Sequence, residues 1–209
     1  MSPASSRLNL TSTSLVRRRL LGAAFALPLL GAFGAFRPVR AADPRRVLVV
    51  CYSHTGTTEA LARAAAEALG GDFHKLELLE PYSTNYSEMT AAARVEKETG
   101  ALRELKGPVP DASGYDLIVV ASPVWSEELA TPAKTYLVTE ARAGHLKGKP
   151  VATLHTPFSS GAEGSRAQAE QLAPDARFVG EPFIALGSGA RTHTNEAQAW
   201  ARKLLEEAL

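Results

Sequence analysis

The stretch SHTGTT (residues 53–58) joins an apolar run, RRVLVVCY (45–52), to a helix-like stretch, EALARAAAEAL (59–69). The apolar run is short, rich in β-branched residues and uncharged after Arg46, which predicts a strand at 46–52 that is buried on both faces. The hexapeptide offers four hydroxyl side chains and one glycine at the start of the predicted helix. Such a loop can hold a phosphate with hydroxyls and helix N–H groups, or its threonines can simply cap the helix.

Apolar runs of strand length alternate with amphipathic, helix-like stretches along the rest of the chain. Strands separated by helices form parallel crossovers, which are right-handed and place helices on both faces of the sheet. The pattern predicts one three-layer α/β domain at residues 42–209, with a doubly wound, five-stranded parallel sheet. Thr131 is expected to cap the third helix, with Pro132 in its first turn. The predicted strands are 46–52, 72–80, 115–122, 150–156 and 177–186, and the predicted helices are 58–69, 86–99, 131–141, 161–173 and 194–209.

In a doubly wound sheet, a ligand binds outside the carboxyl ends of the strands. Three loops follow predicted strands at that edge: residues 53–58, 122–128 and 156–165. The first lacks both the G-x-x-x-x-G-K-[ST] pattern of a nucleoside-triphosphate loop and the G-x-G-x-x-G pattern of a dinucleotide fold. A cysteine-dependent phosphatase is disfavoured, because Cys51 precedes the loop and the loop holds no arginine. The absence of Lys and Arg favours a phosphate held by hydrogen bonds and helix polarity.

The motif [ST]-x-T-G-x-T at residues 53–58 resembles the phosphate loop of the flavodoxin family. The segment ASPVWSEELATP (121–132) is similar to a strand end of that family, in which small-Pro-aliphatic-Trp is followed by a proline that begins the next helix. TPFSSGAEGS (156–165) resembles the family's third flavin-contacting loop, with Pro157, Phe158 and Glu163 diluting its usual run of small residues. The resemblance implies a flavodoxin-like sheet of strand order 2-1-3-4-5 and FMN as the cofactor.

The resemblance also implies which residues contact the cofactor. Trp125 is expected to pack against the flavin ring, although a tryptophan can equally serve as a core or lid aromatic. Tyr82 and Tyr86 lie in a segment similar to an insert of one branch of flavodoxin-like proteins, and either close over the cofactor or are surface aromatics. His54 is expected to point to solvent and to have a minor role. The cofactor-binding residues predicted in this way are Ser53, His54, Thr55, Gly56, Thr57, Thr58, Ser122, Pro123, Val124, Trp125, Ser126, Thr156, Ser159, Ser160, Gly161 and Gly164.

The first 41 residues have the composition of an export signal. They contain six arginines and no acidic residue, with an uncharged apolar run at 20–36 and a small-residue cleavage pattern ending at Ala41. The cluster RRRLL (17–21) resembles a twin-arginine signal, which would place the protein in the periplasm. Left uncleaved, the apolar run would instead be a membrane anchor at the short limit for a spanning helix. Residues 42–209 keep all 22 acidic residues but 17 of the 23 basic ones, and this net charge of −5 argues against nucleic-acid binding.

The sequence therefore predicts an exported FMN-binding redox protein, either an electron carrier or a small FMN-dependent reductase. Its partner would be a redox protein or a small-molecule electron donor or acceptor, and only an uncleaved signal would contact the membrane. Electron transfer to a flavin requires no catalytic acid–base residue, and the five histidines show no metal-ligand spacing. Two alternatives stay open: a cofactor-free binding protein of the same fold, and an NAD(P)H:quinone oxidoreductase.

Overall fold

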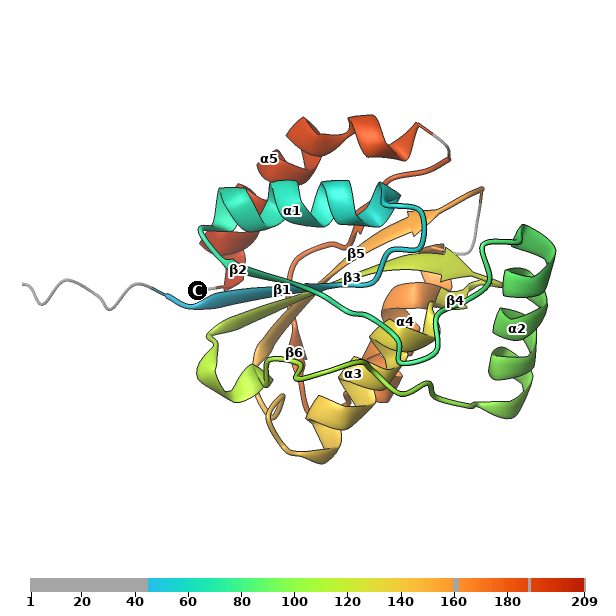
Figure 1. The fold of residues 1–209 in the computed structure, drawn as a ribbon. Helices are drawn as coiled ribbons and strands as arrows, with labels where there is room; N and C mark the ends of the chain where they lie inside the picture. The colour runs from blue at the N-terminus through green and yellow to red at the C-terminus, as the bar shows by residue number, and fades with distance from the viewer. Residues whose placement is uncertain (1–44, 160–161, 188, 209) are drawn as a thin grey trace, which may run out of the picture. The chain divides into compact units, whose positions relative to one another are not determined.

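A parallel sheet with helices on both faces forms the fold (Figure 1). The computed structural model describes residues 45–159, 162–187 and 189–208. The sheet has the order β2-β1-β3-β5-β6, with β7 also parallel to β5 and β4 antiparallel to β3. The strands are β1 (Val47–Cys51), β2 (Asp72–Lys75), β3 (Leu117–Trp125), β4 (Glu128–Leu129), β5 (Pro150–Pro157), β6 (Arg177–Phe178) and β7 (Phe183–Ile184). The helices are α1 (Thr57–Leu69), α2 (Tyr86–Thr99), α3 (Thr131–Arg142), α4 (Ala162–Leu172) and α5 (Thr194–Ala208), with short 3₁₀ turns η1 (Ala112–Gly114) and η2 (Ala190–Thr192).

The predicted strand order 2-1-3-4-5 is confirmed, because β5 is the fourth predicted strand and β6 and β7 together occupy the fifth. The fifth strand is interrupted at Gly180, whose φ of +63° lies in the left-handed region. The second predicted strand is shorter than expected and ends at Lys75. Residues 77–79 leave the sheet because their backbone forms hydrogen bonds with residues 104–106 instead.

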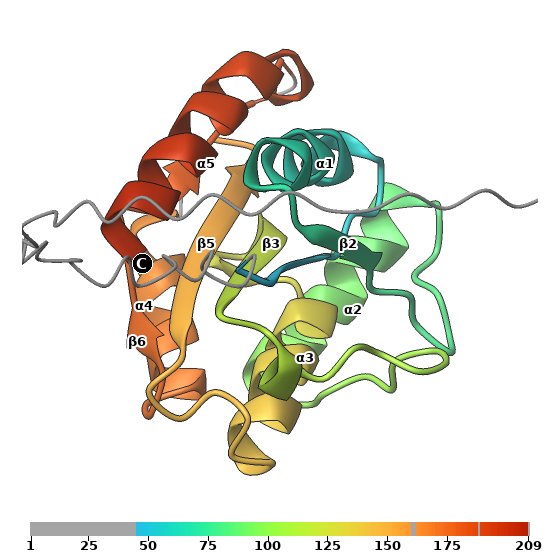
Figure 2. The same ribbon diagram turned by 90° about the vertical axis from the view of Figure 1, so that its left-hand side faces the viewer.

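The sheet separates two hydrophobic cores. Helices α1 and α5 cover one face, and α3 and α4 cover the other (Figures 1 and 2). In β1, Val47, Val49 and Cys51 belong to the core under α1 and α5, whereas Leu48 and Val50 belong to the opposite core. This alternation confirms that the first strand is buried on both faces.

Two helix starts differ from ordinary capped starts. Helix α1 begins after Gly56, which takes the left-handed conformation at φ +84°, and no described side chain caps it. Helix α3 begins after Ala130, again with no capping hydrogen bond from a side chain in the described ranges. The expectation that Thr131 caps α3 is therefore wrong. Thr131 lies in the first turn, and its hydroxyl donates a 2.6 Å hydrogen bond to the buried carboxylate of Glu96.

The predicted signal segment, residues 1–41, lies outside the described residues, so the domain boundary after Ala41 stays a prediction. Of the helices that the structure describes, none combines the length and the apolar character needed to cross a membrane.

One histidine is completely buried within the sheet. His155 lies in β5, and neither of its ring nitrogens has a hydrogen-bond partner among the described residues. Burial, reinforced by the charge of Arg166, lowers the pKa of His155 from 6.5 to about 4. The folded protein therefore keeps this side chain neutral at pH values where an unfolded chain protonates it.

We predict that His155 makes the protein sensitive to mild acid. Below its ordinary pKa the unfolded chain takes up a proton that the folded chain excludes, so the free energy of unfolding falls by up to about 1.4 kcal/mol per pH unit until the folded-state pKa is reached. His155→Leu should remove this part of the pH dependence, measured by urea unfolding between about pH 7.5 and about pH 4.5.

The control is His193→Gln, because the His193 side chain is 47% exposed. This variant should keep the acid sensitivity of the wild-type protein. The prediction fails if the stability curves of wild type and His155→Leu run parallel across the pH range.

Candidate functional site

The loop at residues 53–58, called the phosphate loop below, connects β1 to α1 at the carboxyl end of the sheet. Its threonines do not cap α1. The hydroxyl of Thr58 instead forms a 2.7 Å hydrogen bond with that of Thr156 at the end of β5, and the hydroxyls of Thr55 and Thr57 lie 3.5 Å apart. The structure thus excludes the simple capped turn, and the start of α1 presents backbone N–H groups that a ligand can use.

A carboxylate in the first turn of α1 is paired with two cations. Glu59 lies 2.7 Å from the Arg63 guanidinium and 2.7 Å from the Lys75 ammonium. The hydrogen bond from Lys75 is the largest of the effects that hold the pKa of Glu59 below its usual value. This pairing reduces the repulsion that Glu59 would exert on an anion at the helix start.

A basic residue reaches the phosphate loop from near the other end of the chain. Arg191 lies in η2, and its Nη2 donates a 2.8 Å hydrogen bond to the carbonyl oxygen of Thr55. The loop's own sequence contains no basic residue. No local pattern signals Arg191 either, because 136 residues separate it from Thr55.

The second loop is a tight hairpin between β3 and β4. Trp125 at the end of β3 pairs with Glu128 at the start of β4. The two residues between them, Ser126 and Glu127, have φ values of 51° and 70°, which is the geometry of a type I′ turn. Glycine or asparagine usually occupies such positions, so this turn carries backbone strain.

Ser122, three residues before the hairpin tryptophan, uses its hydroxyl within the protein. The side chain is completely buried, accepts a 3.0 Å hydrogen bond from the Ala130 N–H and donates one of 2.8 Å to the Pro123 carbonyl. Pro123 and Val124 are buried as well. These three residues support the hairpin, and their contact with a cofactor stays a prediction.

Four aromatic rings meet beside the hairpin and are called the aromatic cluster below: Tyr52, His54, Tyr82 and Trp125. The Trp125 ring makes edge-on contacts with the other three, at centroid distances of 5.7 Å to Tyr52, 6.0 Å to His54 and 5.1 Å to Tyr82. The expectation that His54 points to solvent is wrong, because its ring packs on Trp125 and Tyr82. Tyr82 is buried rather than a surface aromatic, whereas Tyr86 is 76% exposed.

A buried carboxylate behind the aromatic cluster holds Tyr82. Glu96 of α2 accepts hydrogen bonds from the hydroxyls of Tyr82 and Thr131 and from the Arg103 guanidinium. Arg103 also lies over the Tyr82 ring, 4.1 Å from its centroid. Burial, together with the hydrogen bond to Glu96, raises the pKa of the Tyr82 hydroxyl above its usual value. These four side chains come from four separate segments, and no sequence pattern connects them.

Helix α2 also holds the hairpin. Lys97, the residue after Glu96, donates a 2.7 Å hydrogen bond to the Ser126 carbonyl, and its ammonium lies 3.6 Å from the Glu127 carboxylate. Adjacent residues of α2 thus fix the aromatic cluster and the strained turn together.

The third loop follows β5 and lies beside the other two. Thr156 is bonded to the phosphate loop, as described above. A Cβ atom built on Gly164 would lie 3.5 Å from the Glu127 carbonyl oxygen, so the start of α4 approaches the hairpin. The three loops therefore meet at one edge of the sheet. Of the predicted residues in this loop, Ser160 and Gly161 lie outside the described residues.

An exposed aromatic side chain stands in the third loop. Phe158 is 77% exposed, between the buried Pro157 and the exposed Ser159. A large apolar side chain in this position can cover a ligand at the strand ends. In the sequence Phe158 counted only as a dilution of the small-residue run, and no pattern indicated its exposure.

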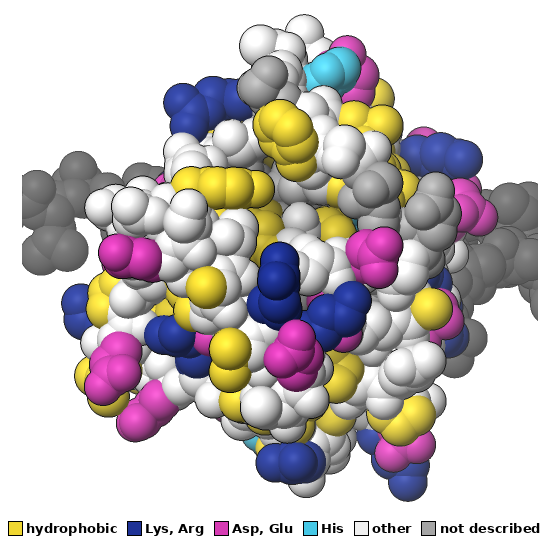
Figure 3. All heavy atoms as spheres, turned by 90° about the vertical axis from the view of Figure 1, so that its right-hand side faces the viewer, with side chains coloured by type: hydrophobic (Ala, Val, Ile, Leu, Met, Phe, Trp, Pro, Cys, Tyr) yellow, Lys and Arg dark blue, Asp and Glu magenta, His cyan; other side chains and the backbone are white. Residues whose placement is uncertain are grey.

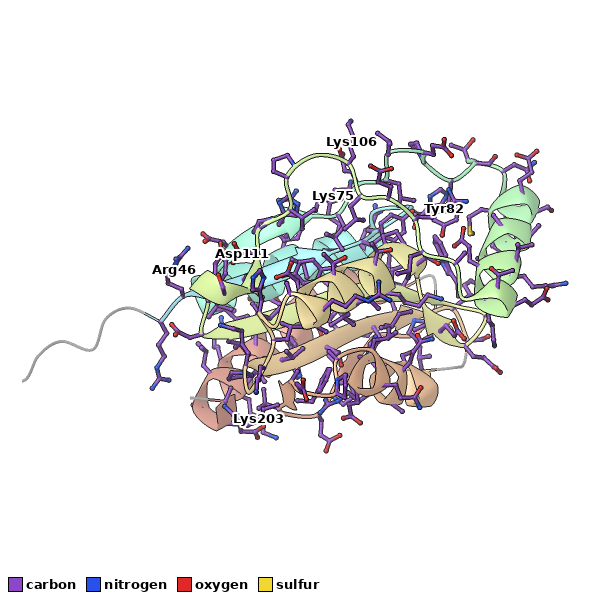
Figure 4. The ribbon with its side chains drawn as sticks, turned by 90° about the horizontal axis from the view of Figure 1, so that it is seen from below. Arg46, Lys75, Tyr82, Lys106, Asp111 and Lys203 are labelled. Atoms are coloured by element: carbon purple, nitrogen blue, oxygen red, sulfur yellow. The ribbon has the colours of Figure 1, made fainter. Side chains whose placement is uncertain are left out.

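The face formed by the strand ends is shown in Figure 3, where hydrophobic side chains gather in the upper half and charges of both signs lie side by side across the middle. A cleft of about 210 Å³ opens beside the phosphate loop. Figure 4 shows Lys75, Lys106 and Tyr82, three of its lining residues, along one edge of the molecule. Within the described ranges, no group of three or more His, Cys, Asp or Glu side chains is placed to bind a metal ion.

Comparison with known proteins identifies the family to which this chain belongs. A family model described as flavodoxin matches residues 46–203, which is most of the chain. The chain belongs to the flavodoxin family. A comparison with curated proteins gave no match.

Solved structures share the flavodoxin fold at low sequence identity. A candidate flavoprotein from Bacteroides eggerthii aligns with a TM-score of 0.61 and 23% identity, over 77% of this chain and 98% of that one. A Lactobacillus acidophilus flavoprotein in complex with FMN aligns with a TM-score of 0.60 and 19% identity, over 75% and 99% of the two chains. Oxidised flavodoxin 1 from Bacillus cereus gives a TM-score of 0.51 and 14% identity, over 77% and 97%.

In this flavodoxin-family protein, we predict that Glu96→Gln loosens the aromatic cluster. The amide leaves Arg103 without its carboxylate partner and weakens the hydrogen bond to Tyr82, so the free energy of unfolding should fall by about 2 kcal/mol. Urea unfolding measures the loss, and near-ultraviolet circular dichroism should show weaker aromatic signals. Glu98→Gln, at an exposed position of α2, is the control. An unchanged stability and spectrum for Glu96→Gln would refute the dependence of the cluster on this carboxylate.

Proposed function

We propose that this protein binds FMN and acts as a flavodoxin-type redox protein. The observation that carries the proposal is the meeting of a donor-rich helix start with the aromatic cluster at the ends of β1, β3 and β5. FMN has both matching parts, a phosphate group and a large flat ring. Membership of the flavodoxin family and the FMN complex of the Lactobacillus acidophilus flavoprotein support the proposal.

The residues present fit such a cofactor. Hydroxyls of the phosphate loop and backbone N–H groups of the first α1 turn would hold the phosphate, and the left-handed Gly56 gives the loop its turn. Trp125 would offer the ring an aromatic face, and the exposed Phe158 would shield it from water. Backbone groups of the third loop would bind the polar edge of the ring. Bound FMN would supply the electron-transfer chemistry, and the chain would bind, orient and shield it.

The protein would serve as an electron carrier or a small FMN-dependent reductase. Electron transfer through a flavin needs orientation and electrostatic tuning rather than a catalytic acid–base residue. The partner would be a redox protein or a small-molecule electron donor or acceptor. Steady-state turnover with NAD(P)H and a quinone would instead identify a quinone oxidoreductase.

We predict that the purified protein binds one FMN per chain, with quenched flavin fluorescence and a shifted visible spectrum. Trp125→Ala should weaken FMN binding by about tenfold, because the ring loses its aromatic face and the apolar contact. Trp125→Phe, which keeps an aromatic face, should retain most of the affinity. Colourless protein that ignores added FMN would contradict the proposed function and favour a cofactor-free binding protein.

We also propose that the protein is exported in the folded state by the twin-arginine route, is cleaved after Ala41 and works in the periplasm. The support is the basic, acid-free N-terminal segment with the RRRLL cluster (17–21) and its apolar run. A route for folded proteins suits a chain whose cofactor is inserted before export.

Export predicts a processed periplasmic protein whose first residue is Ala42. Replacing Arg17 and Arg18 together by lysine should leave the precursor in the cytoplasm, because the paired guanidinium groups are the signal that the route reads. Arg7→Lys is the matched control and should be exported normally. Cell fractionation and intact-mass measurement test this. Normal export of the double variant would rule out the twin-arginine route, and a mature chain that keeps residues 1–41 would rule out cleavage.

A further inference from the structure

The phosphate loop has no cationic side chain of its own to balance the charge of a bound phosphate. A phosphate monoester carries between one and two negative charges at neutral pH, and its loop contains neither Lys nor Arg. Residues 42–209 have a net charge of −5, which adds to the repulsion. The start of α1 offers only the partial positive charge of a helix terminus. A full positive charge close to the loop would therefore strengthen the binding of a phosphate.

Two cations beside the start of α1 already share a carboxylate partner. Arg63 and Lys75 both pair with the Glu59 carboxylate. Arg191 is different, because its partner at the phosphate loop is the neutral carbonyl oxygen of Thr55. Among the described residues, no carboxylate forms an ion pair with Arg191. Its charge is thus uncompensated in the part of the chain that the structure describes.

Arg191 also lies close to the start of α1. Its Nη2 is 3.0 Å from the point where a Cβ atom would stand on Gly56, the residue that precedes the helix. The preceding residue, Ala190, is completely buried in the core under α1 and α5, so η2 is anchored to the same layer as α1. A guanidinium has five N–H donors in a planar fork, and its bond to Thr55 occupies one of its nitrogens.

We infer that Arg191 is the cationic contact of the cofactor phosphate and makes the site selective for FMN over riboflavin. This inference rests on the proposed FMN site and names a residue outside the phosphate loop that recognises the phosphate. Riboflavin has the same ring system without the phosphate, so the pair of ligands separates a contact with the phosphate from a contact with the ring. The glycine at position 56 has a second role in this arrangement, because a side chain there would displace the guanidinium.

The test compares dissociation constants for FMN and riboflavin, measured by fluorescence quenching. Arg191→Gln should weaken FMN binding by about tenfold and leave riboflavin binding within about twofold. Arg191→Lys keeps the charge without the fork and should recover part of the FMN affinity. Arg202→Gln removes an equal charge from an exposed position of α5 and should change neither constant. Added salt should weaken FMN binding by the wild type more than by Arg191→Gln.

The outcomes separate this inference from the proposed function. If the wild-type protein binds neither flavin, the proposed function fails and the inference fails with it. Suppose that the wild type binds FMN. If Arg191→Gln then weakens the binding of FMN and riboflavin equally, or weakens the binding of neither, only the inference is overturned. Urea unfolding of each variant checks that a lost affinity does not come from a misfolded protein.

Discussion

Parallel pairing of β3 with both β1 and β5 is the constraint on which the candidate site depends. In this register Cys51 lies opposite Ala121, and Pro123 lies opposite Thr156. Strand β3 continues four residues past Ala121, and β5 continues three residues past Leu154, the partner of Ala121, so both extend beyond the end of β1. The loops that follow the three strands open at one edge of the sheet. A slip of one residue would exchange the side chains that face the two cores, so the close fit of side chains within each core protects this register. Core packing thus keeps the phosphate loop, the hairpin and the third loop within reach of one another.

The sequence was sufficient to predict most helix bounds and the three loops, because each rests on a local signal, whereas the strand order was implied by the resemblance to the flavodoxin family. Helix α2 was predicted at residues 86–99 and has those bounds, and it ends at Gly100 in the left-handed conformation. The buried strands were recognisable from short runs of β-branched residues. The exact ends of some elements depend on contacts between distant segments. Strand β2 ends earlier than predicted because residues 77–79 pair with residues 104–106.

The interior of the candidate site was much less predictable. Glu96 appears in the sequence as one of several charged residues on a polar helix, yet it is buried and joined to Tyr82, Arg103 and Thr131. A buried carboxylate is tolerated only with hydrogen-bonded partners, and such partners leave no periodic trace in a sequence. The same limit applies to Arg191, because its position at the phosphate loop depends on how the C-terminal segment packs beside α1. The sequence predicted the loops, and the structure adds the polar contacts between residues that lie far apart in the sequence.

The type I′ turn at Ser126 and Glu127 has a consequence for how this site can vary. Neither residue favours a positive φ, so the turn owes its shape to its surroundings, which include the Lys97 contact from α2. The position of the adjacent Trp125 then depends in part on α2, a helix that lies outside the strand-end loops. Substitutions along α2 can shift the tryptophan without altering any residue of the three loops. Related chains with identical loops but different α2 helices would on this basis differ in the environment that they present to the same ligand.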